Sequence, residues 1–395
     1  MKKGLVKRPL SLLYDATSLG KRMSGLERYT EELLKAIIPK IREKGLTLSV
    51  LFSSNEIARK FVTQEMEGEG IVPFFPKHPF SSRLIKDHLW IPKMIRRLAP
   101  RVAFFPAFPP SPFVFWGSNG TLFWRTIHDA VSWKHTETLS WKNSVYFLPL
   151  ETFAIKRYNL IVTVSQFSLS ELRSVFPKES DHMVDFGNSV SALPAISSGI
   201  SLERERLRDK WPLPDRYILC VGTLEPRKNF PFIIEMMGSL RRLVPDVGLV
   251  IAGRDGWGAG AVREALRKAG PASGILLTGA ISDSELQALY SGASLVAFPS
   301  LYEGFGYPVL EAMQWGCPVI ANRIPVMEEV VGEGGILVPV SDQSGWIDAM
   351  ARVLEDSGER ERLLPKMRSN LDRYRWDLVA DRFLEKLEKV QSLPR

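Results

Sequence analysis

The sequence predicts an α/β protein built of two doubly wound parallel-sheet domains that face each other across a cleft. First, 395 residues are too many for one ordinary core and suit two domains of nearly 200 residues. Second, near-continuous apolar runs alternate with amphipathic stretches, which is typical of a parallel sheet covered on both faces. Third, the alternation is interrupted once, by the small and polar stretch VDFGNSVSALPAISSGISLE at 184–203, where we expect a linker.

The first half contains five apolar runs with the length of strands. A helix is expected between the first two, because LERYTEELLKAI at 26–37 has helical spacing. The expected strands are PLSLLY (9–14), TLSVLF (47–52), RVAFFP (101–106), TLFWRTIH (121–128) and NLIVTVS (159–165).

The second half repeats the pattern after the linker, and each strand is followed by a plausible helix. The expected strands are RYILCVG (216–222), VGLVIAG (247–253), GILLTG (274–279), SLVAFPS (294–300) and CPVIA (317–321). We therefore predict domains over 1–193 and 194–375, with a last segment at 376–395. Two such units bind ligands at the carboxyl ends of their strands.

Composition restricts the class of protein. Cys220 and Cys317 lie in separate apolar runs, so neither a disulfide framework nor a zinc site is expected, and the default location is a reducing cytoplasm. The N-terminus lacks the apolar run of a signal peptide, and no window approaches ~18 uninterrupted apolar residues. The net charge of +8 favours anionic partners, namely phosphorylated small molecules, anionic lipid or nucleic acid.

The segment VGTLEPRKNF at 221–230 reads as a strand, a turn and a helix start. It places Arg227 and Lys228 in the first helical turn, beside free backbone N–H groups. A helix N-terminus with two cations suits a diphosphate. A lone Arg-Lys pair is more often a solvated surface feature, but its position at the carboxyl end of a strand favours the diphosphate.

Two further segments have weaker signals. The glycines of VIAGRDGWGAG (250–260) either let backbone approach a ligand or only form a turn. In SDSE (282–285), Ser282 and Glu285 form a capping box that we assign to structure.

The segment EGFGYPVLE at 303–311 is the strongest signal. A strand ends before it, Glu303 lies in a glycine-rich turn, and Pro308 begins a helix that carries Glu311 about one turn on. Backbone N–H groups around Gly304, Phe305 and Gly306 would point the same way. Carboxylates accept two hydroxyl hydrogen bonds at once, so the pair suits a polyol ligand. In the structural alternative, Glu303 caps the helix and Glu311 is solvated.

This segment resembles the E-x7-E motif of the retaining glycosyltransferase family 4, whose GT-B fold has two Rossmann-like domains. The likeness covers nearly the whole chain. VGTLEPRKN resembles the donor-phosphate segment of that family, and GCPVIANRIPVMEEVVGEGGILVPV resembles the continuation of the motif. DATSLGKRMSGLERYTEEL is similar to its first glycine-rich loop and helix, and TIHDAV and VTVSQFSLSEL to its HD and VS-x-x-S segments. RWDLVADRFLEKLEKV is similar to the last helix, which crosses back onto the N-terminal domain.

The resemblance implies a role for each matched residue. Arg227 and Lys228 would bind the donor diphosphate and stabilise the leaving nucleotide, and Glu311 would accept from the ribose hydroxyls. Glu303 and the amides of Gly304, Phe305 and Gly306 would hold the donor sugar. From the N-terminal, acceptor-side domain, His128 would lie near the donor sugar, Gly25 would let the first loop approach the ligands, and Arg28 would face the same cleft. A free-standing histidine is more often a satisfied core residue, but His128 follows a strand and precedes Asp129.

The implied reaction is the transfer of a hexose from a nucleoside-diphosphate sugar, with GDP-mannose or a UDP-sugar as donor, to a saccharide or lipid-linked acceptor in cell-surface polysaccharide or glycolipid synthesis. The sequence has no Asp-x-Asp triplet, so we expect no metal, and we expect no cofactor. No residue identifies itself as a covalent nucleophile, which favours front-face attack with the donor phosphate as base.

Residues 77–101 form a basic amphipathic segment with seven Lys or Arg against Asp87 alone. Such a segment can lie on an anionic membrane surface. It can equally be a surface helix that packs its apolar side on the domain, and the two interpretations are compatible.

Other classes of protein fit less well. The charge would suit a nucleic-acid binder, but no recognition motif accompanies it, so we expect no nucleic acid. A nicotinamide-dependent dehydrogenase needs a G-x-G-x-x-G after the first strand, and DATSLGKRMSGLER lacks it. A nucleotide-sugar epimerase of the same fold, or a non-catalytic sugar-nucleotide binder, is the remaining alternative.

Overall fold

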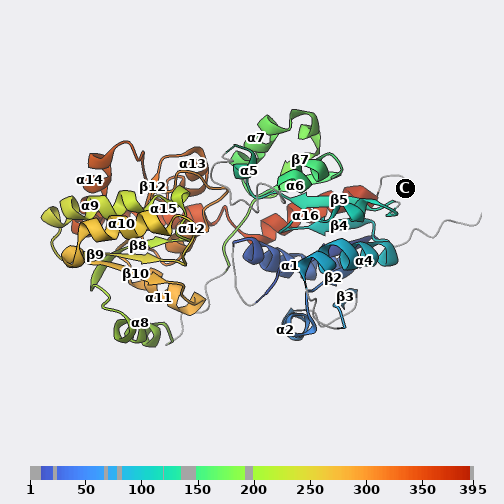
Figure 1. Ribbon diagram of the computed structural model, residues 1–395, viewed down its shortest axis with the longest axis horizontal. Helices are drawn as coiled ribbons and strands as arrows, with labels where there is room; N and C mark the ends of the chain where they lie inside the picture. The colour runs from blue at the N-terminus through green and yellow to red at the C-terminus, as the bar shows by residue number, and fades with distance from the viewer. Residues whose placement is uncertain are drawn as a thin grey trace, which may run out of the picture. The chain divides into compact units, whose positions relative to one another are not determined.

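The computed structural model describes residues 10–20, 25–65, 70–77, 82–118, 120–134, 148–191 and 199–391. The chain divides into two compact units, one of residues 1–189 with 375–395 and one of residues 190–374 (Figure 1). Parts of the first glycine-rich loop (21–24), of the linker (192–198) and of the basic segment (78–81) lie outside the described residues.

The first unit is a parallel sheet covered by helices. Its strands follow the order β3-β2-β1-β4-β5-β6-β7. The strands are β1 (Ser11–Asp15), β2 (Thr47–Leu51), β3 (Ile71–Phe74), β4 (Val102–Phe105), β5 (Leu122–Thr126), β6 (Leu160–Thr163) and β7 (Met183–Asp185). The helices are α1 (Gly25–Glu43), α2 (Asn55–Glu65), α3 (Arg83–Ile85), the π-helix η1 (Lys86–Trp90), α4 (Ile91–Leu98), η2 (Pro112–Phe115), α5 (Val131–Lys134), α6 (Leu148–Ile155), α7 (Gln166–Val175), η5 (Pro177–His182) and α16 (Trp376–Gln391).

The second unit has the same architecture, with the order β10-β9-β8-β11-β12-β13. The strands are β8 (Arg216–Val221), β9 (Val247–Ala252), β10 (Ile275–Gly279), β11 (Leu295–Phe298), β12 (Val319–Asn322) and β13 (Ile336–Val338). The helices are α8 (Gly199–Lys210), η6 (Pro226–Lys228), α9 (Phe230–Leu243), α10 (Ala259–Ala269), η7 (Pro271–Ser273), α11 (Asp283–Gly292), α12 (Tyr307–Gln314), α13 (Pro325–Val331), α14 (Gln343–Glu355) and α15 (Ser357–Leu371).

The predicted fold class of two doubly wound parallel-sheet domains is confirmed. All ten expected strands are present, and most are apolar runs whose side chains are buried on both faces; β10, at the edge of its sheet, is partly buried throughout. Three strands were not expected, namely β3, β7 and β13. All three lie at the edge of a sheet and have only three or four residues, so their burial is partial and their apolar signal is weak.

Helix α16 returns to the first unit and packs along α1. Phe383, from its middle, contacts the rings of Phe104 on β4 and Trp124 on β5, with centroids 5.0 and 5.5 Å apart. Lys40 of α1 pairs with Asp381 at 2.5 Å. The last helix therefore covers the sheet of the first unit, although the chain has passed through the second unit before reaching it.

Both sheets contain one point where the strand order reverses. In the first unit it lies between β1 and β4, and in the second between β8 and β11, which pair directly in each case. Loops that leave the carboxyl ends of such a pair diverge and leave a crevice, where ligands of doubly wound proteins bind. The topology thus marks one candidate position in each unit.

Candidate active site

The reversal point of the second unit brings together the two motifs that the sequence singled out. The loop after β8 carries residues 222–229 and the loop after β11 carries residues 299–306. A backbone hydrogen bond of 2.7 Å from the Leu301 N–H to the Arg227 carbonyl joins the loops. Residues separated by about 75 positions in the sequence therefore lie in contact.

Arg227 and Lys228 do not lie in the first turn of a helix, as expected from the sequence. They end the short 3-10 turn η6, and α9 begins only at Phe230. Asn229 separates the two elements because its φ of 52° is left-handed, which interrupts helical geometry. The two cations are consequently presented by a tight turn before the helix.

The side chains of this turn surround one carboxylate. Arg227 donates from Nη1 to Oε2 of Glu303 at 2.7 Å, and Lys228 donates from Nζ to Oε1 of the same side chain. Arg227 also donates from Nε to Glu225 at 2.9 Å and from Nη1 to the carbonyl of Tyr302 at 3.3 Å. We call Arg227, Lys228, Glu303 and Glu225 the cation–carboxylate cluster.

The cluster is an electrostatically coupled and mostly buried group. Lys228 and Glu303 are each only 7% exposed. Burial alone would raise the pKa of Glu303, but Lys228 and Arg227 outweigh it and hold that pKa at about 2. Burial lowers the pKa of Lys228, and the neighbouring Arg227 acts in the same direction. Glu303 is therefore ionised at neutral pH, and its two cations are held in fixed positions before any ligand arrives.

Glu225 was missed by the sequence analysis. Its carboxylate accepts a hydrogen bond from Nε of Arg227. This bond orients the guanidinium plane so that Nη1 reaches Glu303. The signal in the sequence is its spacing, two residues before the arginine and on the same turn.

The glycine-rich loop after β9 packs against the loop that carries Arg227 and Lys228. This contact favours the interpretation that the glycines of VIAGRDGWGAG have a structural role. A Cβ on Gly253 would lie 1.8 Å from the carbonyl oxygen of Gly222. The Leu224 N–H donates to the Arg254 carbonyl at 3.0 Å, and the Gly258 N–H donates to the Leu224 carbonyl at 2.9 Å. These glycines allow one loop backbone to pack against the other, and so they fix the position of the turn that carries the cations.

The start of α12 shows why the EGFG turn contains glycine. Gly306 is the N-cap residue with φ 113°, and a Cβ there would meet the methyl group of Met327 at 2.6 Å. Glu303 is not the N-cap residue of α12, and its carboxylate oxygens accept from Arg227 and Lys228. Phe305 is buried against Tyr307 and Tyr374, whereas Gly304 is partly exposed.

Glu311 lies one turn into α12 and is half-buried. Its Oε2 atom accepts a hydrogen bond of 2.8 Å from the hydroxyl of Tyr290 on α11. The expected capping box at Ser282 and Glu285 begins that helix, so this expectation is confirmed. Helix α11 thus starts at a defined residue and positions the tyrosine that orients Glu311.

His128 belongs to the first unit and follows β5. Its Nε2 atom donates to the carbonyl of Pro106 at 2.8 Å, because a carbonyl can only accept, and its ring packs edge-on against Tyr29. Burial lowers the pKa of His128 to about 4. The ring is therefore neutral at physiological pH, with the proton on Nε2 and the lone pair on Nδ1.

Gly25 and Arg28 lie at the start of α1, also in the first unit. Gly25 is exposed and is the first residue of the helix, and Arg28 is half-buried in the first turn. The remainder of the loop before them, residues 21–24, lies outside the described residues.

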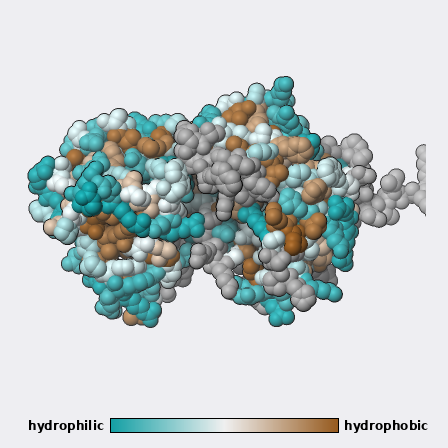
Figure 2. Space-filling view, in the orientation of Figure 1, coloured by the Kyte–Doolittle hydropathy of each residue, from teal (hydrophilic) through white to brown (hydrophobic). Residues whose placement is uncertain are grey.

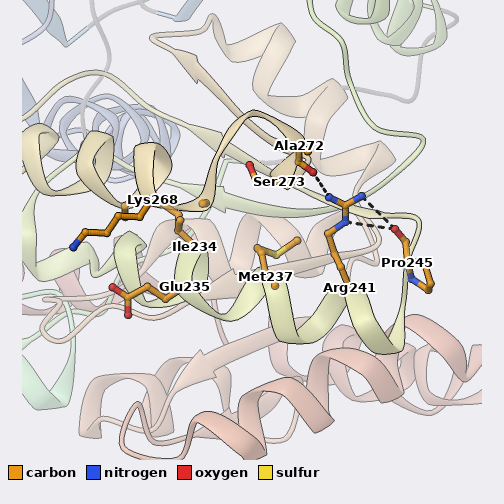
Figure 3. Close-up of a pocket in the computed structure, with 11 residues that line it drawn as sticks. Ile234, Glu235, Met237, Arg241, Pro245, Lys268, Ala272 and Ser273 are labelled. Atoms are coloured by element: carbon orange, nitrogen blue, oxygen red, sulfur yellow. Dashed lines mark hydrogen bonds between the residues drawn. The ribbon is translucent and has the colours of Figure 1, made fainter.

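A cavity of about 670 Å³ elsewhere in the second unit is not part of this site. It lies between α9 and α10, near the amino ends of β9 and β10, which is the opposite edge of the sheet from the cluster (Figure 3). Arg241 crosses one end of it and donates to the carbonyls of Ala272 and Pro245. Among the described residues, no group of three or more His, Cys, Asp or Glu could hold a metal ion.

The fold is similar to that of solved structures. HepE of Anabaena, solved in complex with UDP and glucose, superposes with a TM-score of 0.69 over 96% of this chain and all of its own, at 16% identity. WaaG, a glycosyltransferase involved in lipopolysaccharide biosynthesis, gives 0.64 over 96% of this chain and 99% of its own, at 15% identity. The fold is that of the GT-B glycosyltransferases.

The second unit is similar in sequence to a known family. The family model of the glycosyl transferases group 1 matches residues 203–370, which form most of the second unit. O-antigen chain mannosyltransferase B of Escherichia coli is 29% identical over 224 residues, 55% of this chain and 57% of that protein. A phosphatidyl-myo-inositol mannosyltransferase of Mycolicibacterium smegmatis is 30% identical over 53% of this chain and 54% of that protein. The chain thus spans little more than half the length of either relative.

Proposed function

We propose that the chain is a glycosyltransferase that moves a hexose from a nucleoside-diphosphate sugar to a saccharide or lipid-linked acceptor in cell-surface polysaccharide or glycolipid synthesis. The observation that carries this proposal is the cation–carboxylate cluster at the reversal point of the second sheet. The group 1 match covers the same residues, and relatives named as mannosyltransferases support GDP-mannose as donor, with a UDP-sugar as the second candidate.

In this proposal the second unit binds the donor, and the first unit, with helix α16, serves the acceptor. Arg227 and Lys228 contact the diphosphate, and Glu311 accepts from the ribose hydroxyls. Glu303 accepts from a hydroxyl of the donor sugar, assisted by the backbone amides of residues 304–306. From the first unit, Nδ1 of neutral His128 accepts from the donor sugar, and the loop at Gly25 and Arg28 contributes to the acceptor side.

The charges of the cluster fit the chemistry of glycosyl transfer. Breaking the bond between the anomeric carbon and the phosphate leaves negative charge on the phosphate and positive character on the sugar. Preorganised cations stabilise this leaving group, and removing one such group typically costs ~10²–10³ in rate. Since Arg227 and Lys228 supply the charge, we propose a transfer that needs no metal and no cofactor.

We also propose that the configuration of the anomeric carbon is retained. Glu303 is held between two cations, so its carboxylate is stabilised as an anion and is a weak nucleophile. This favours front-face attack by the acceptor, with the departing phosphate taking the proton of the acceptor hydroxyl. The newly formed bond then lies on the same face as the bond that breaks.

The test is the double variant Arg227→Ala, Lys228→Ala, with binding of GDP and UDP measured by titration calorimetry. We expect a folded protein of reduced stability that no longer binds the diphosphate. Affinity equal to that of the wild type would refute the phosphate assignment. With a nucleotide sugar, the wild-type enzyme should release nucleoside diphosphate only when an acceptor is present, whereas an epimerase would interconvert donor sugars without one.

A second part of the proposal concerns an anionic membrane surface. Among the described residues, no helix is long and apolar enough to cross a membrane. Helix α4 packs its apolar side on the domain, as the structural interpretation expected, because Ile91, Met94 and Ile95 are buried. The residues just before it behave differently, since Leu84 is 56% and Leu89 63% exposed.

The structure adds a second segment to this surface. Trp116, just after η2, is 62% exposed, and its carbonyl accepts from Arg96 of α4 at 3.4 Å. Figure 2 shows hydrophobic side chains on the surface of this unit beside hydrophilic ones. Exposed Leu and Trp side chains beside Lys and Arg are typical of a surface that inserts shallowly into anionic lipid.

Sedimentation with vesicles of phosphatidylglycerol tests this part. Each Lys or Arg near the surface contributes about 1 kcal/mol, so Arg96→Glu, Arg97→Glu should abolish sedimentation and leave GDP or UDP binding intact. Reversal of Lys178, which is exposed elsewhere in this unit, is the matched control. Wild-type protein that stays in the supernatant at low salt would contradict the proposal.

A further inference from the structure

The first unit has a crevice at the position that corresponds to the cluster of the second unit. Strand β1 ends at Asp15, the loop after it carries Thr17 and Ser18, and the loop after β4 runs to Ser111. Since β1 and β4 pair in parallel at the reversal point, both loops leave the same edge of the sheet. The topology predicts a ligand there as it does between β8 and β11.

A third segment, α3 with the π-helix η1, closes the crevice and supplies Arg83, Lys86 and Asp87. The space between the walls is about 10 Å³, which is the size needed for one water molecule or one hydroxyl group. A sugar ring or a phosphate group is too large for this space. The walls therefore select a single small polar group.

Lys86 is one of the residues that line this space. Its Nζ donates to the hydroxyl of Thr17 at 3.1 Å and to the Thr17 carbonyl at 3.4 Å, and it lies 3.4 Å from Asp87. The Lys86 side chain is 12% exposed. It is the first residue of η1, and short π-helical segments occur frequently at functional sites.

Asp15 faces Lys86 from the end of β1. Its Oδ1 atom accepts from the Thr17 N–H at 3.0 Å, and a carboxylate has lone pairs on both oxygens with which it can accept further hydrogen bonds. Burial raises the pKa of Asp15, and the charge of Lys86 opposes this effect. The crevice thus contains a hydrogen-bond acceptor and a hydrogen-bond donor around one small volume.

The charge balance indicates the kind of group that fits. Asp15 and Asp87 offset Arg83 and Lys86, and Arg83 is further engaged by Asp87 at 3.0 Å and by the ring of Phe108 at 4.2 Å. A balanced site does not favour an anion. A hydroxyl donates one hydrogen bond and accepts others, so it matches a carboxylate and an ammonium group together.

We propose that this crevice binds one hydroxyl group of the acceptor saccharide, which donates to Asp15 and accepts from Lys86. The inference rests on the proposed function and deepens it, because it names a specificity pocket on the acceptor side. An acceptor that lacks this hydroxyl forms neither of the two hydrogen bonds with Asp15 and Lys86. Loss of one charged hydrogen bond corresponds to about ten- to a hundredfold in affinity.

The probes are the methyl glycosides of mannose, glucose, galactose and N-acetylglucosamine, followed by the monodeoxy analogues of the one that binds best. Saturation-transfer NMR with GDP or UDP present gives their affinities for the wild type, Lys86→Met, Asp15→Asn and the control Lys178→Met. For the wild type and the control, we expect one deoxy analogue to bind at least tenfold more weakly than its parent. For Lys86→Met and Asp15→Asn, that discrimination should disappear.

Three results would overturn the inference: equal binding of all deoxy analogues to the wild type, undiminished discrimination by both variants, or no binding of any glycoside to the wild type. Calorimetry with GDP and UDP separates this failure from that of the proposed function. If the nucleotides bind all four proteins equally, the donor assignment stands and only the crevice is in question. Asp15→Asn keeps the shape of the side chain, so it reports on the crevice even if Lys86→Met is poorly folded.

Discussion

Replacement of Glu303 by glutamine tests whether the cation–carboxylate cluster is the electrostatic unit described above. The change keeps the size of the side chain but removes its charge, and so it leaves Arg227 and Lys228 without their shared partner. Breaking a buried ion pair by removing one partner is strongly destabilising, by about 3–5 kcal/mol. We therefore expect the second unit to lose stability.

The pKa of Glu303 gives a second value for this loss of stability. The pKa of Glu303 is about 2 in the folded protein against an ordinary 4.5. A lowered carboxyl pKa means that the unfolded chain binds the proton more tightly, so the stabilisation is complete above the ordinary pKa and is lost as the pH falls toward 2. The difference corresponds to about 3 kcal/mol at pH 7. This value lies within the range expected for breaking a buried ion pair.

The assay is urea-dependent hydrogen exchange of the β8 and β11 amides, which reports on the second unit alone. Glu303→Gln should lower the free energy of unfolding by about 3 kcal/mol at pH 7, and the difference should shrink between pH 5 and pH 2. Glu264→Gln is the control, because Glu264 pairs with Arg267 on an exposed face of α10 and should show no measurable change. Equal stabilities of the two variants at pH 7 would refute the electrostatic interpretation of the cluster.

Three further predictions concern other parts of the structure. Gly253→Ala should displace the loop after β8 and abolish GDP or UDP binding, which calorimetry checks; normal binding would show that Gly253 does not fix the position of that loop. Gly260→Ala in α10, where a Cβ has open space, should stabilise the protein by up to about 1 kcal/mol in thermal unfolding. Glu311→Gln should weaken nucleoside diphosphate and nucleotide sugar alike by about 1.5–3 kcal/mol in calorimetry, and an effect that persists with 2′,3′-dideoxy nucleotides would exclude the ribose assignment. His128 should titrate near pH 4 in imidazole NMR spectra, with the proton on Nε2 above that pH. Its contribution to stability is therefore complete above pH 6.5 and declines as the pH falls toward 4. A midpoint near 6.5 would show that burial does not lower the pKa of the ring.

The sequence alone was enough to predict the fold class and the segments of the site. Parallel strands that are buried on both faces have sequences that are continuous apolar runs. Helix starts have local sequence signals, such as the capping box at Ser282 and Pro308 at the start of α12. Both kinds of signal depend on neighbours in the chain. The edge strand β13 has only three residues, which is too short for a comparable signal.

The tertiary structure decided which side chains meet. Glu303 lies 76 residues from Arg227 and 75 from Lys228 in the sequence, and the three meet only because β8 and β11 are adjacent where the strand order reverses. The left-handed Asn229, which moves both cations out of α9, depends on the packing of the loop and has no periodic signal. Likewise, nothing local connects Lys86 with Thr17, 69 residues away, until β1 and β4 pair. Local patterns therefore specified the elements, whereas strand order, which is a property of the whole core, determined the contacts of the site.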